Sequence, residues 1–430
     1  MYPLKFQIKT MKKIILLLAL CSFSSLSWAQ VTLEDAQFWR PYDKRGINMY
    51  EAGKEDTVAY DGIKVRLGGG FAQQFQGLSH SNTSVPNPLI EIGNGFNLAT
   101  ANLNLDVALA DGVRLNLITY LSSRHHPETW VKGGFLQVDK VPFMNSPVLD
   151  KIFEKITLKV GHMEINYGDA HFRRTDNANA FYNPFVGNYI MDAFTTEIGA
   201  EVIYQSNGLL AVGSVTGGEI QGGVTNPDSR ELSFMGKLGY DKQVEENIRI
   251  RLTGSIYHTA GSNRNTLYAG DRTGSRYYLV MEPEGASTSA NFTSGRFNPG
   301  QTDNITAMVL NPFIKVSGFE FFGNLEQSTG KAANETENRK WNQIGADVVY
   351  RFGMAEKFYL AGRYNKVSGE MQDAIEASID RVQIGGGWFV TDNILAKLEY
   401  VNQNYNDFGA MDVRNGGKFN GFMIEGVIAF

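Results

Sequence analysis

The sequence predicts an all-β chain, a transmembrane antiparallel β-barrel of about 16 strands with long extracellular loops and short periplasmic turns. Three observations predict it. Apolar and polar residues alternate through many segments of about 10 to 15 residues, the length that a tilted membrane strand requires with some overhang. The connections between these segments alternate between short and long. The final segment, 418–430, ends on the aromatic residue Phe430.

The first 29 residues have the features of a targeting signal. A pair of lysines at 12–13 precedes the apolar run 14–20, and a small-x-small site closes the stretch at 27–29. This order of basic, apolar and cleavage regions is typical of a secretory signal peptide. We therefore expect residues 1–29 to be removed and the mature chain to begin near residue 30.

Cys21, the only cysteine, falls inside this signal. It is a weak candidate for acylation, because the bulky Leu20 stands where a lipoprotein signal needs a small residue. The mature chain is then expected to contain no disulfide bond. Residues 30–60 have mixed charge and no clean period, so we expect a periplasmic N-terminal extension or a plug segment folded into the barrel mouth. The barrel is expected to comprise 61–430.

The charge balance argues against one class of partner. The formal net charge of −5 includes the lysines of the signal, so the mature chain is more acidic still. An acidic chain argues against a nucleic-acid partner. Beyond the signal, no stretch approaches the ~20 apolar residues of a transmembrane helix. A barrel does not need one, because only alternate residues of its strands meet lipid.

The alternating pattern begins at Gly62 and continues to the end of the chain. Strands are expected at 62–76, 95–109, 113–123, 130–140, 155–166, 193–206, 209–218, 230–241, 246–259, 302–315, 318–328, 340–352, 357–369, 378–390, 394–406 and 418–430. The short connections contain Asp-Gly and Asn-Gly pairs, which supply the positive φ of tight hairpin turns. Only the link 141–154 breaks the short set. A soluble β-sandwich, the alternative, has no reason to segregate its loops by length.

The period of two also assigns the faces of the strands. A charge at the lipid-facing midplane costs ~2–4 kcal/mol, so charged residues should face the lumen. The expected lumen-lining residues are Arg114, Lys159, Lys237, Arg249, Arg251, Arg351, Arg363, Arg381 and Lys397, with Asp106, Glu197, Glu201, Asp347, Glu399 and Glu425. Aromatics at strand ends, among them Phe352, Phe358, Trp388 and Phe430, fit interfacial girdles.

The connection 167–192 is the most unusual loop. It is rich in aromatics and contains His171, Arg173, Arg174 and Asp176. We expect it to fold inward and form a pore constriction, where the two arginines would attract anions. The alternative is an exposed extracellular loop.

The sequence gives little support for an enzyme or a metal site. Ser122, Ser123, His125 and His126 lie close together, and His162, Glu164 and His171 suggest a metal site. Adjacent strand residues such as His125 and His126 point to opposite faces, and nothing fixes the position of His171 relative to the strand before it. We expect no enzyme, no metal and no cofactor.

At this point the chain resembles the phosphate-selective porin O/P-like outer-membrane porins of the type widespread in Bacteroidota. The resemblance covers roughly 60–430 and rests on the signal, the strand spacing, the stretch LKVGHMEINYGDAHF (158–172) and the terminal Phe430. It implies a Gram-negative outer-membrane porin, embedded among lipid and lipopolysaccharide, through which small hydrophilic solutes or ions diffuse. It also implies a homotrimer, and barrel-assembly machinery that reads Phe430 as an insertion signal.

A second function stays open. A barrel plugged by its own segments could serve as an accessory subunit of an outer-membrane assembly or secretion complex. The long connection 260–301, with a strand-like stretch at 277–281, is large for a simple porin loop. It is expected to pack over the barrel mouth or to bind a partner.

Overall fold

The computed structural model describes residues 37–56, 58–84, 88–125, 128–176, 179–217, 230–262, 264–270 and 276–430. The expected signal peptide lies outside these residues. The strands are β1 (Lys64–Ser81), β2 (Gly95–Phe96), β3 (Thr100–Ala110), β4 (Val113–Leu121), β5 (Trp130–Val138), β6 (Ile156–Glu164), β7 (Thr196–Ser206), β8 (Leu209–Thr216), β9 (Ser233–Glu245), β10 (Ile248–Thr259), β11 (Asn304–Val316), β12 (Phe319–Lys331), β13 (Arg339–Phe352), β14 (Phe358–Glu370), β15 (Glu376–Thr391), β16 (Ile394–Asn406) and β17 (Lys418–Ala429).

Helical structure is sparse in the described chain. It comprises α2 (Pro147–Phe153) and the 3-10 turns η1 (Lys44–Gly46), η2 (Pro142–Met144), η3 (Ala170–Arg173), η4 (Ala180–Tyr182) and η6 (Met354–Glu356). Among the described helices, none has the length and apolarity to cross a membrane.

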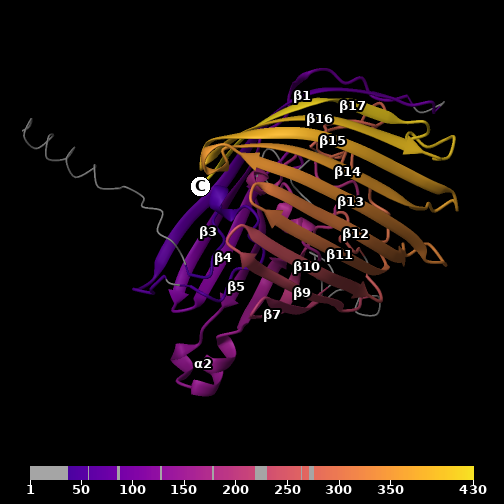
Figure 1. The fold of residues 1–430 in the computed structure, drawn as a ribbon. Coiled ribbons are helices and arrows are strands. Elements are labelled where there is room, and N and C mark those ends of the chain that lie inside the picture. Colours follow the sequence, from indigo (N-terminus) through magenta and orange to yellow (C-terminus); the bar gives the residue numbers. More distant parts are fainter. Residues whose placement is uncertain are drawn as a thin grey trace, which may run out of the picture. The chain divides into compact units, whose positions relative to one another are not determined.

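The strands close into a single antiparallel barrel (Figure 1). Each long strand from β3 onward pairs with the next, and β1 closes the ring by pairing with both β17 and β3. The closing register runs from Gly70↔Ala429 to Ser81↔Lys418. Sixteen long strands form the barrel, as the sequence predicts. Each of the sixteen long strands therefore has a hydrogen-bonded neighbour on both sides, and closure leaves no unpaired edge strand among them.

The expected strand 95–109 is the one whose outline is wrong. It is interrupted at 97–99, so that the two-residue β2 pairs with β1 at Phe75↔Phe96 and β3 pairs with β1 from residue 100 onward. Across the gap, Asn97 N still donates to Gln74 O at 3.0 Å. The interruption is local, because β1 is long enough to pair with both pieces.

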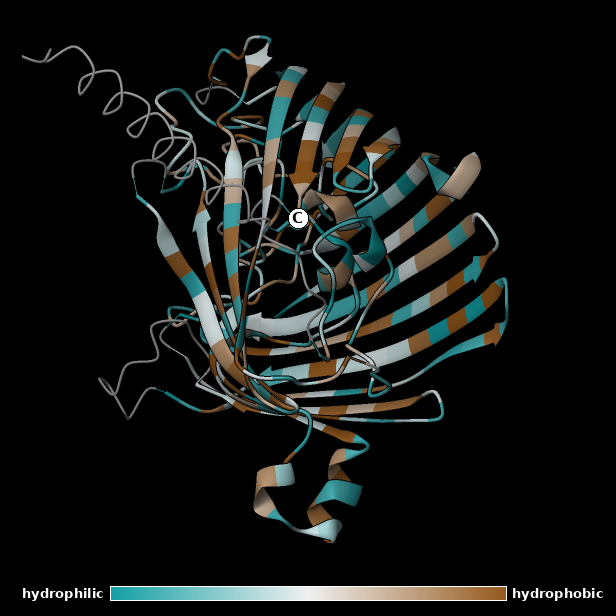
Figure 2. Ribbon diagram, turned by 90° about the vertical axis from the view of Figure 1, so that its left-hand side faces the viewer, coloured by the Kyte–Doolittle hydropathy of each residue, from teal (hydrophilic) through white to brown (hydrophobic). Residues whose placement is uncertain are grey.

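Side chains alternate between the two faces of the wall. Ile344 and Val348 of β13 are 55% and 43% exposed, whereas Asp347 between them is 1% exposed. The same alternation of hydrophilic and hydrophobic residues runs along the strands in Figure 2. Tyr350, Phe352, Phe358 and Trp388 form an outward row with stacked rings, whose successive centroids are 6.1, 5.9 and 6.2 Å apart. Apolar outside and charged inside is the reverse of a soluble protein and suits a wall in lipid.

The connections differ between the two ends of the barrel. At one end, β3–β4, β7–β8, β9–β10, β11–β12, β13–β14 and β15–β16 are joined by short turns. Asn207 and Gly208 take φ values of 52° and 87°, the left-handed conformation that a two-residue hairpin turn requires. The link between β5 and β6 is the exception at this end, because it contains η2 and α2.

Candidate functional site

Three stretches of chain contact the inner face of the wall. They are the N-terminal segment (described residues 37–56 and 58–63), the inner segment (described residues of 165–195) and the long loop (described residues of 260–303). Their contacts decide which inward side chains stay accessible, so each is considered in turn.

The N-terminal segment lies against the inner wall through polar contacts. Tyr42 Oη donates to Asp106 Oδ2 of β3 at 2.7 Å. Glu51 forms ion pairs with Lys237 of β9 at 3.3 Å and with Arg251 of β10 at 2.9 Å. This segment therefore touches opposite parts of the wall, although its own sequence has no strand or helix period.

The inner segment crosses from β6 to the far side of the lumen. Asp169 pairs with Arg251 at 2.7 Å, and Tyr189 Oη donates to Asp347 Oδ1 of β13 at 2.9 Å. Further along, Val186 N donates to Glu399 Oε2 of β16 at 2.7 Å. Most of its aromatic side chains are buried, and Phe172 is partly buried.

Each of the four residues expected at a constriction contacts a different partner. His171 Nδ1 lies 2.5 Å from Glu164 Oε1. Arg173 contacts Asn48 and Glu320, the latter at 3.6 Å, and Arg174 binds Asp192 at 2.7 Å. Asp176 pairs with Lys132 of β5.

The expectation that Arg173 and Arg174 form an exposed anion-attracting pair is wrong. The two residues are only 4% and 3% exposed, and each guanidinium has a carboxylate neighbour. The backbone becomes extended at Arg174, with φ −102° and ψ 157° at the end of η3. Consecutive side chains then diverge, and the two charges serve different contacts.

A cluster of four buried charges joins both segments to the wall. Asp169 accepts from Arg251 Nε at 2.7 Å, from Arg251 Nη2 at 2.8 Å and from Lys237 Nζ at 3.0 Å, while Glu51 completes the set. We call these four residues the central ion cluster. Burial alone would raise the pKa of Glu51, but Lys237 and Arg251 outweigh burial and lower this pKa to about 2. Burial also opposes ionisation of Asp169, and the same two cations hold the pKa of Asp169 below its ordinary value. The cluster has two positive and two negative groups and is self-neutralising.

The long loop also reaches into the barrel. Tyr268 Oη donates to Glu326 Oε1 of β12 at 2.8 Å, and Tyr277 Oη donates to Glu399 Oε1 at 2.7 Å. The expected strand-like stretch 277–281 is wrong: these residues form turns, with φ values of 58° at Leu279 and 59° at Met281. They pack on inner-wall groups such as Gln76, whose Oε1 accepts from Tyr278 N at 2.8 Å.

The expected lumen-lining charges lie on the inner face, and most are paired there. The pairs are Arg114–Asp106, Lys159–Glu201, Arg249–Asp241, Arg351–Glu320, Arg363–Asp347 and Lys397–Glu425, with N···O distances of 2.9, 3.2, 2.7, 2.6, 2.6 and 2.9 Å. Arg251 belongs to the central ion cluster, and Glu399 accepts from Tyr277 and Val186. The wall is highly charged but nearly neutral over short distances.

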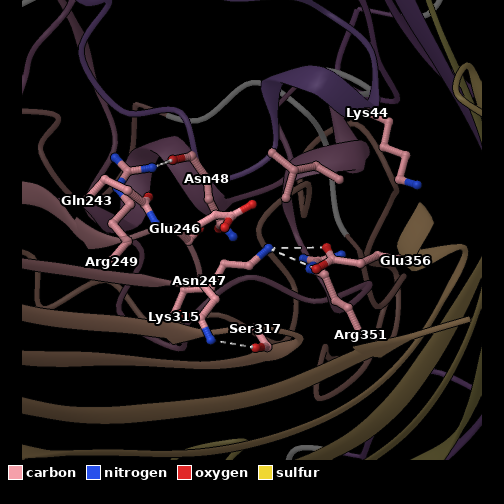
Figure 3. Close-up of a pocket in the computed structure, with 11 residues that line it drawn as sticks. Lys44, Asn48, Gln243, Glu246, Asn247, Arg249, Lys315, Ser317, Arg351 and Glu356 are labelled. Carbon is pink, nitrogen blue, oxygen red and sulfur yellow. Dashed lines mark hydrogen bonds and ion pairs between the residues drawn. The ribbon is translucent and has the colours of Figure 1, made fainter. Parts of the chain in front are cut away.

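The described part of the chain leaves cavities beside these segments. A cavity of about 550 Å³ lies at the short-turn end, between the N-terminal segment and the turns after β9, β11 and β13 (Figure 3). Lys44, Arg249, Lys315 and Arg351 bring positive charge to it, and Lys315 is paired with Glu356 at 3.2 Å. A second cavity of about 190 Å³ lies between the inner segment and strands β4 to β7.

The smaller cavity contains residues that the sequence indicated and others that it did not. His171 and Asp176 line it, together with Lys132 of β5 and Arg40 of the N-terminal segment. Lys132 has the same parity as outward-facing Leu136, so a strict period of two assigns it to the lipid face. The register shift between β4 and β5 at Ile118/Thr119 turns Lys132 inward, and only its charge could have assigned it to the lumen. Arg40 lies in a stretch without any period, and no local signal indicates its place.

The suspected catalytic and metal groups do not assemble into such a site. His125 stacks on Trp130 with ring centroids 4.0 Å apart, and His126 lies outside the described residues. Glu164 bonds His171, while His162 Nε2 lies 3.1 Å from Thr196 Oγ1. In the described part of the chain, no group of three or more His, Cys, Asp or Glu side chains is arranged to hold a metal ion.

A closed barrel with an apolar outer face, an aromatic row and a charged interior defines an integral outer-membrane protein that crosses the bilayer many times as a β-barrel. No protein-family model matches the chain, and none of the curated proteins matches it. Solved structures do resemble it. The anion-selective porin from Comamonas acidovorans superposes with a TM-score of 0.53 at 12% identity, over 86% of this chain and 100% of that chain.

Two further solved structures resemble this chain. The outer membrane channel DcaP of Acinetobacter baumannii gives a TM-score of 0.51 at 10% identity, over 86% of this chain and 99% of that chain. The outer membrane protein OmpT of Vibrio cholerae, in a trimer form, gives 0.51 at 11% identity, over 86% of this chain and 100% of that chain. At these identities the likeness shows the fold, which is that of outer-membrane porins.

Proposed function

We propose that this protein is an outer-membrane porin through which small hydrophilic solutes or ions diffuse. The observation that carries the proposal is the pair of cavities left along a hydrophilic inner wall, about 550 Å³ at the short-turn end and about 190 Å³ beside β4 to β7. A barrel of this strand number has an interior wide enough for water. Two similar structures, an anion-selective porin and an outer membrane channel, support the same proposal.

The permeation path runs between the inner segment and strands β4 to β7. Inward side chains of β10 to β17 are almost all buried under the inserted segments, whereas Lys159 and His162 of β6 keep partial exposure. The inner segment then acts as the constriction, with His171 and Asp176 at its border. Lys159, in place of the two buried arginines, sets the local charge that a solute meets, whereas Lys132 is only 5% exposed and pairs with Asp176.

Recording from planar bilayers tests the proposal. The purified protein is expected to give stable ion conductance at neutral pH. Lys159→Gln should shift permeability toward cations, because it removes a positive charge from the path. The shift should shrink as salt rises, since the screening length falls from ~10 Å at 0.1 M to ~3 Å at 1 M. Lys151→Gln, on the link outside the barrel, is the matched control and should leave selectivity unchanged. A protein that conducts nothing in its folded form would refute the porin function.

An accessory role is the second candidate, and the filled side of the lumen favours it. The inner segment and the long loop contact Arg381, Gln383 and Asn365, which are 0% exposed. A plugged barrel could be a subunit of an outer-membrane assembly or secretion complex. Absence of conductance, together with stoichiometric partners that are lost when 260–301 is shortened, would replace the porin proposal by this one.

Several finer assignments belong to the same proposal. Residues 1–29 serve as the signal peptide and 30–60 as a plug segment. Phe430, whose backbone N donates to Gly69 O at 3.0 Å, serves as an insertion signal for the barrel-assembly machinery. The trimer form of one neighbour supports a homotrimer embedded among lipid and lipopolysaccharide. Preference for phosphate, which the resemblance to the O/P-like porins of Bacteroidota implies, is measured in the same bilayers by adding phosphate to a chloride bath.

A further inference from the structure

The link between β5 and β6 is built unlike the other connections at its end of the barrel. The others are short turns, but residues 139–155 form η2 and then α2. Ser146 is the N-cap of α2, where its hydroxyl accepts from Leu149 N, and Pro147 occupies the first turn. These are the ordinary signals of a helix start, so the link is a folded unit rather than a slack loop.

The helix is amphipathic. Val148, Leu149, Ile152 and Phe153 share one face at helical spacing, and Asp150, Lys151 and Glu154 share the other. No residue of α2 is buried. Val148 and Ile152 are 69% and 44% exposed, and Phe143 and Met144 of η2 are 59% and 55% exposed. We call these four side chains the apolar ridge.

The ridge stands beside the lipid-facing surface. In both ribbon views the link projects away from the barrel wall below β5, rather than folding back over the lumen (Figures 1 and 2). The outward side chains of the two adjoining strands are apolar, with Leu136 of β5 and Val160 of β6 37% and 47% exposed. The link that bears the ridge thus joins two strands whose outer faces are apolar, at the end of the barrel where the short turns lie.

We propose that the apolar ridge is an interfacial anchor, and that its occupant is the periplasmic leaflet of the outer membrane at the boundary between headgroups and acyl chains. Apolar side chains gathered on one side of a preformed amphipathic helix are favoured at this depth, where the polar face keeps water and the apolar face leaves it. Phe and Met carry much of the ridge, and Lys151 and Lys155 are positioned to reach phosphate groups. The anchor would fix the height and tilt of β5 and β6, and it does not depend on whether the lumen conducts.

Site-directed spin labelling of the full chain in phospholipid vesicles tests the anchor. In a Cys21→Ser background the protein has no other cysteine. A nitroxide is attached to Val148→Cys on the ridge, to Lys151→Cys on the polar face of the same helix, and to Val160→Cys as a lipid-facing reference. Oxygen concentrates in the bilayer and a nickel chelate in water, so the ratio of the two collision rates reports depth. Heat-modifiable migration confirms that each variant is folded, and Ile152→Cys is the second ridge position if Val148→Cys does not fold.

The ridge label is expected to give an oxygen-to-nickel ratio several-fold above that of the Lys151→Cys label and close to that of the Val160→Cys label. Equal access of nickel to both helix labels would place the ridge in water and overturn the proposal. Shielding of the ridge label from both reagents, with spin–spin broadening that disappears when unlabelled protein is added in excess, would overturn it too. That result would assign the ridge to a contact between copies of this chain.

Discussion

The substitution Asp169→Ala should release the inner segment from the wall without opening the barrel. The Asp169 carboxylate is 0% exposed and accepts from Lys237, Arg251 and Thr253, at distances of 2.7 to 3.0 Å. Without it, Glu51 is the remaining carboxylate of the central ion cluster beside Lys237 and Arg251. Asp241, which also binds Arg251, already pairs with Arg249, so one positive charge is left uncompensated. The strand ladders of β9 and β10 are untouched, so the effect should stay local to the inner segment.

The size of the effect follows from the loss of one of the two anionic groups of the central ion cluster. Removing one partner of a buried ion pair costs ~3–5 kcal/mol, because the remaining charge stays desolvated. Each 1.4 kcal/mol is about a factor of ten in an equilibrium constant. The released population of the inner segment should therefore rise by about a hundred-fold to several thousand-fold.

Tryptic cleavage at Arg173 and Arg174 measures this population. Both residues are nearly buried in the native protein, at 4% and 3% exposure. Cleavage that requires prior opening tracks the equilibrium population of the open form when opening is fast. The mature protein in nanodiscs, digested with dilute trypsin, should be cut at 173–174 faster in the Asp169→Ala variant by the factor given above.

Two comparisons make the experiment decisive. Asp373→Ala, in the connection between β14 and β15, removes an exposed carboxylate for which no ion pair is found among the described residues, and it should leave the rate at 173–174 unchanged. Asp169→Asn keeps the size of the side chain and should give an intermediate rate. Equal cleavage of wild type and Asp169→Ala would refute the role of the central ion cluster. Faster cleavage at every basic residue would show global unfolding instead of local release.

Three other predictions follow from the fold and the lumen. The pKa of Glu51 is lowered from 4.5 to about 2, so the contribution of Glu51 to stability is complete above pH 4.5 and is lost as the pH falls toward 2. Hydrogen exchange at 37–56, corrected for intrinsic rates, should therefore be unchanged from pH 8 to 5 and faster below about pH 4. Phe430→Asp should lower outer-membrane levels while signal cleavage stays intact, and normal assembly of this variant would show that the terminal aromatic is not an insertion signal. Ile344→Lys places a charge on the outward face at a cost of ~2–4 kcal/mol, so it should lower the midpoint of urea unfolding in bilayers; an unchanged midpoint would contradict a lipid-facing position.

Much of the barrel can be predicted from a period of two that is visible in the sequence alone. Alternation of two fixes the face of every residue in a strand once one face is assigned, and the cost of a charge in lipid makes that assignment. Arg251, Asp347 and Glu399 therefore fall on the inner face, and the closing strand presents Phe422 and Ile424 outward. Across the gap at 97–99, apolar residues switch from even positions (Phe96, Leu98) to odd positions (Leu103, Leu105), and this change of phase is the signal in the sequence that could have indicated the interruption.

The N-terminal and inner segments show where sequence reasoning stops. Glu51 contacts Lys237, which lies 186 residues away in the sequence. Nothing in the local sequence of 30–60 predicts that Glu51 binds a cation or that the segment lies against the barrel wall. Arg173 and Arg174 read as one positively charged pair, but the extended backbone at Arg174 turns them to different partners, Glu320 and Asp192.

The sequence by itself determined the fold class, the approximate strand number, the faces of the strands and the inward position of the charges, because each of these follows from spacing along the chain and from the solvent on either side of the wall. Only the tertiary structure decided which charges neutralise one another, how far the lumen is filled and where space remains. Those outcomes depend on closure of the barrel, which brings Glu51, Asp169, Lys237 and Arg251 into one buried cluster. These contacts join residues that are far apart in the sequence, so no local sequence pattern predicts them.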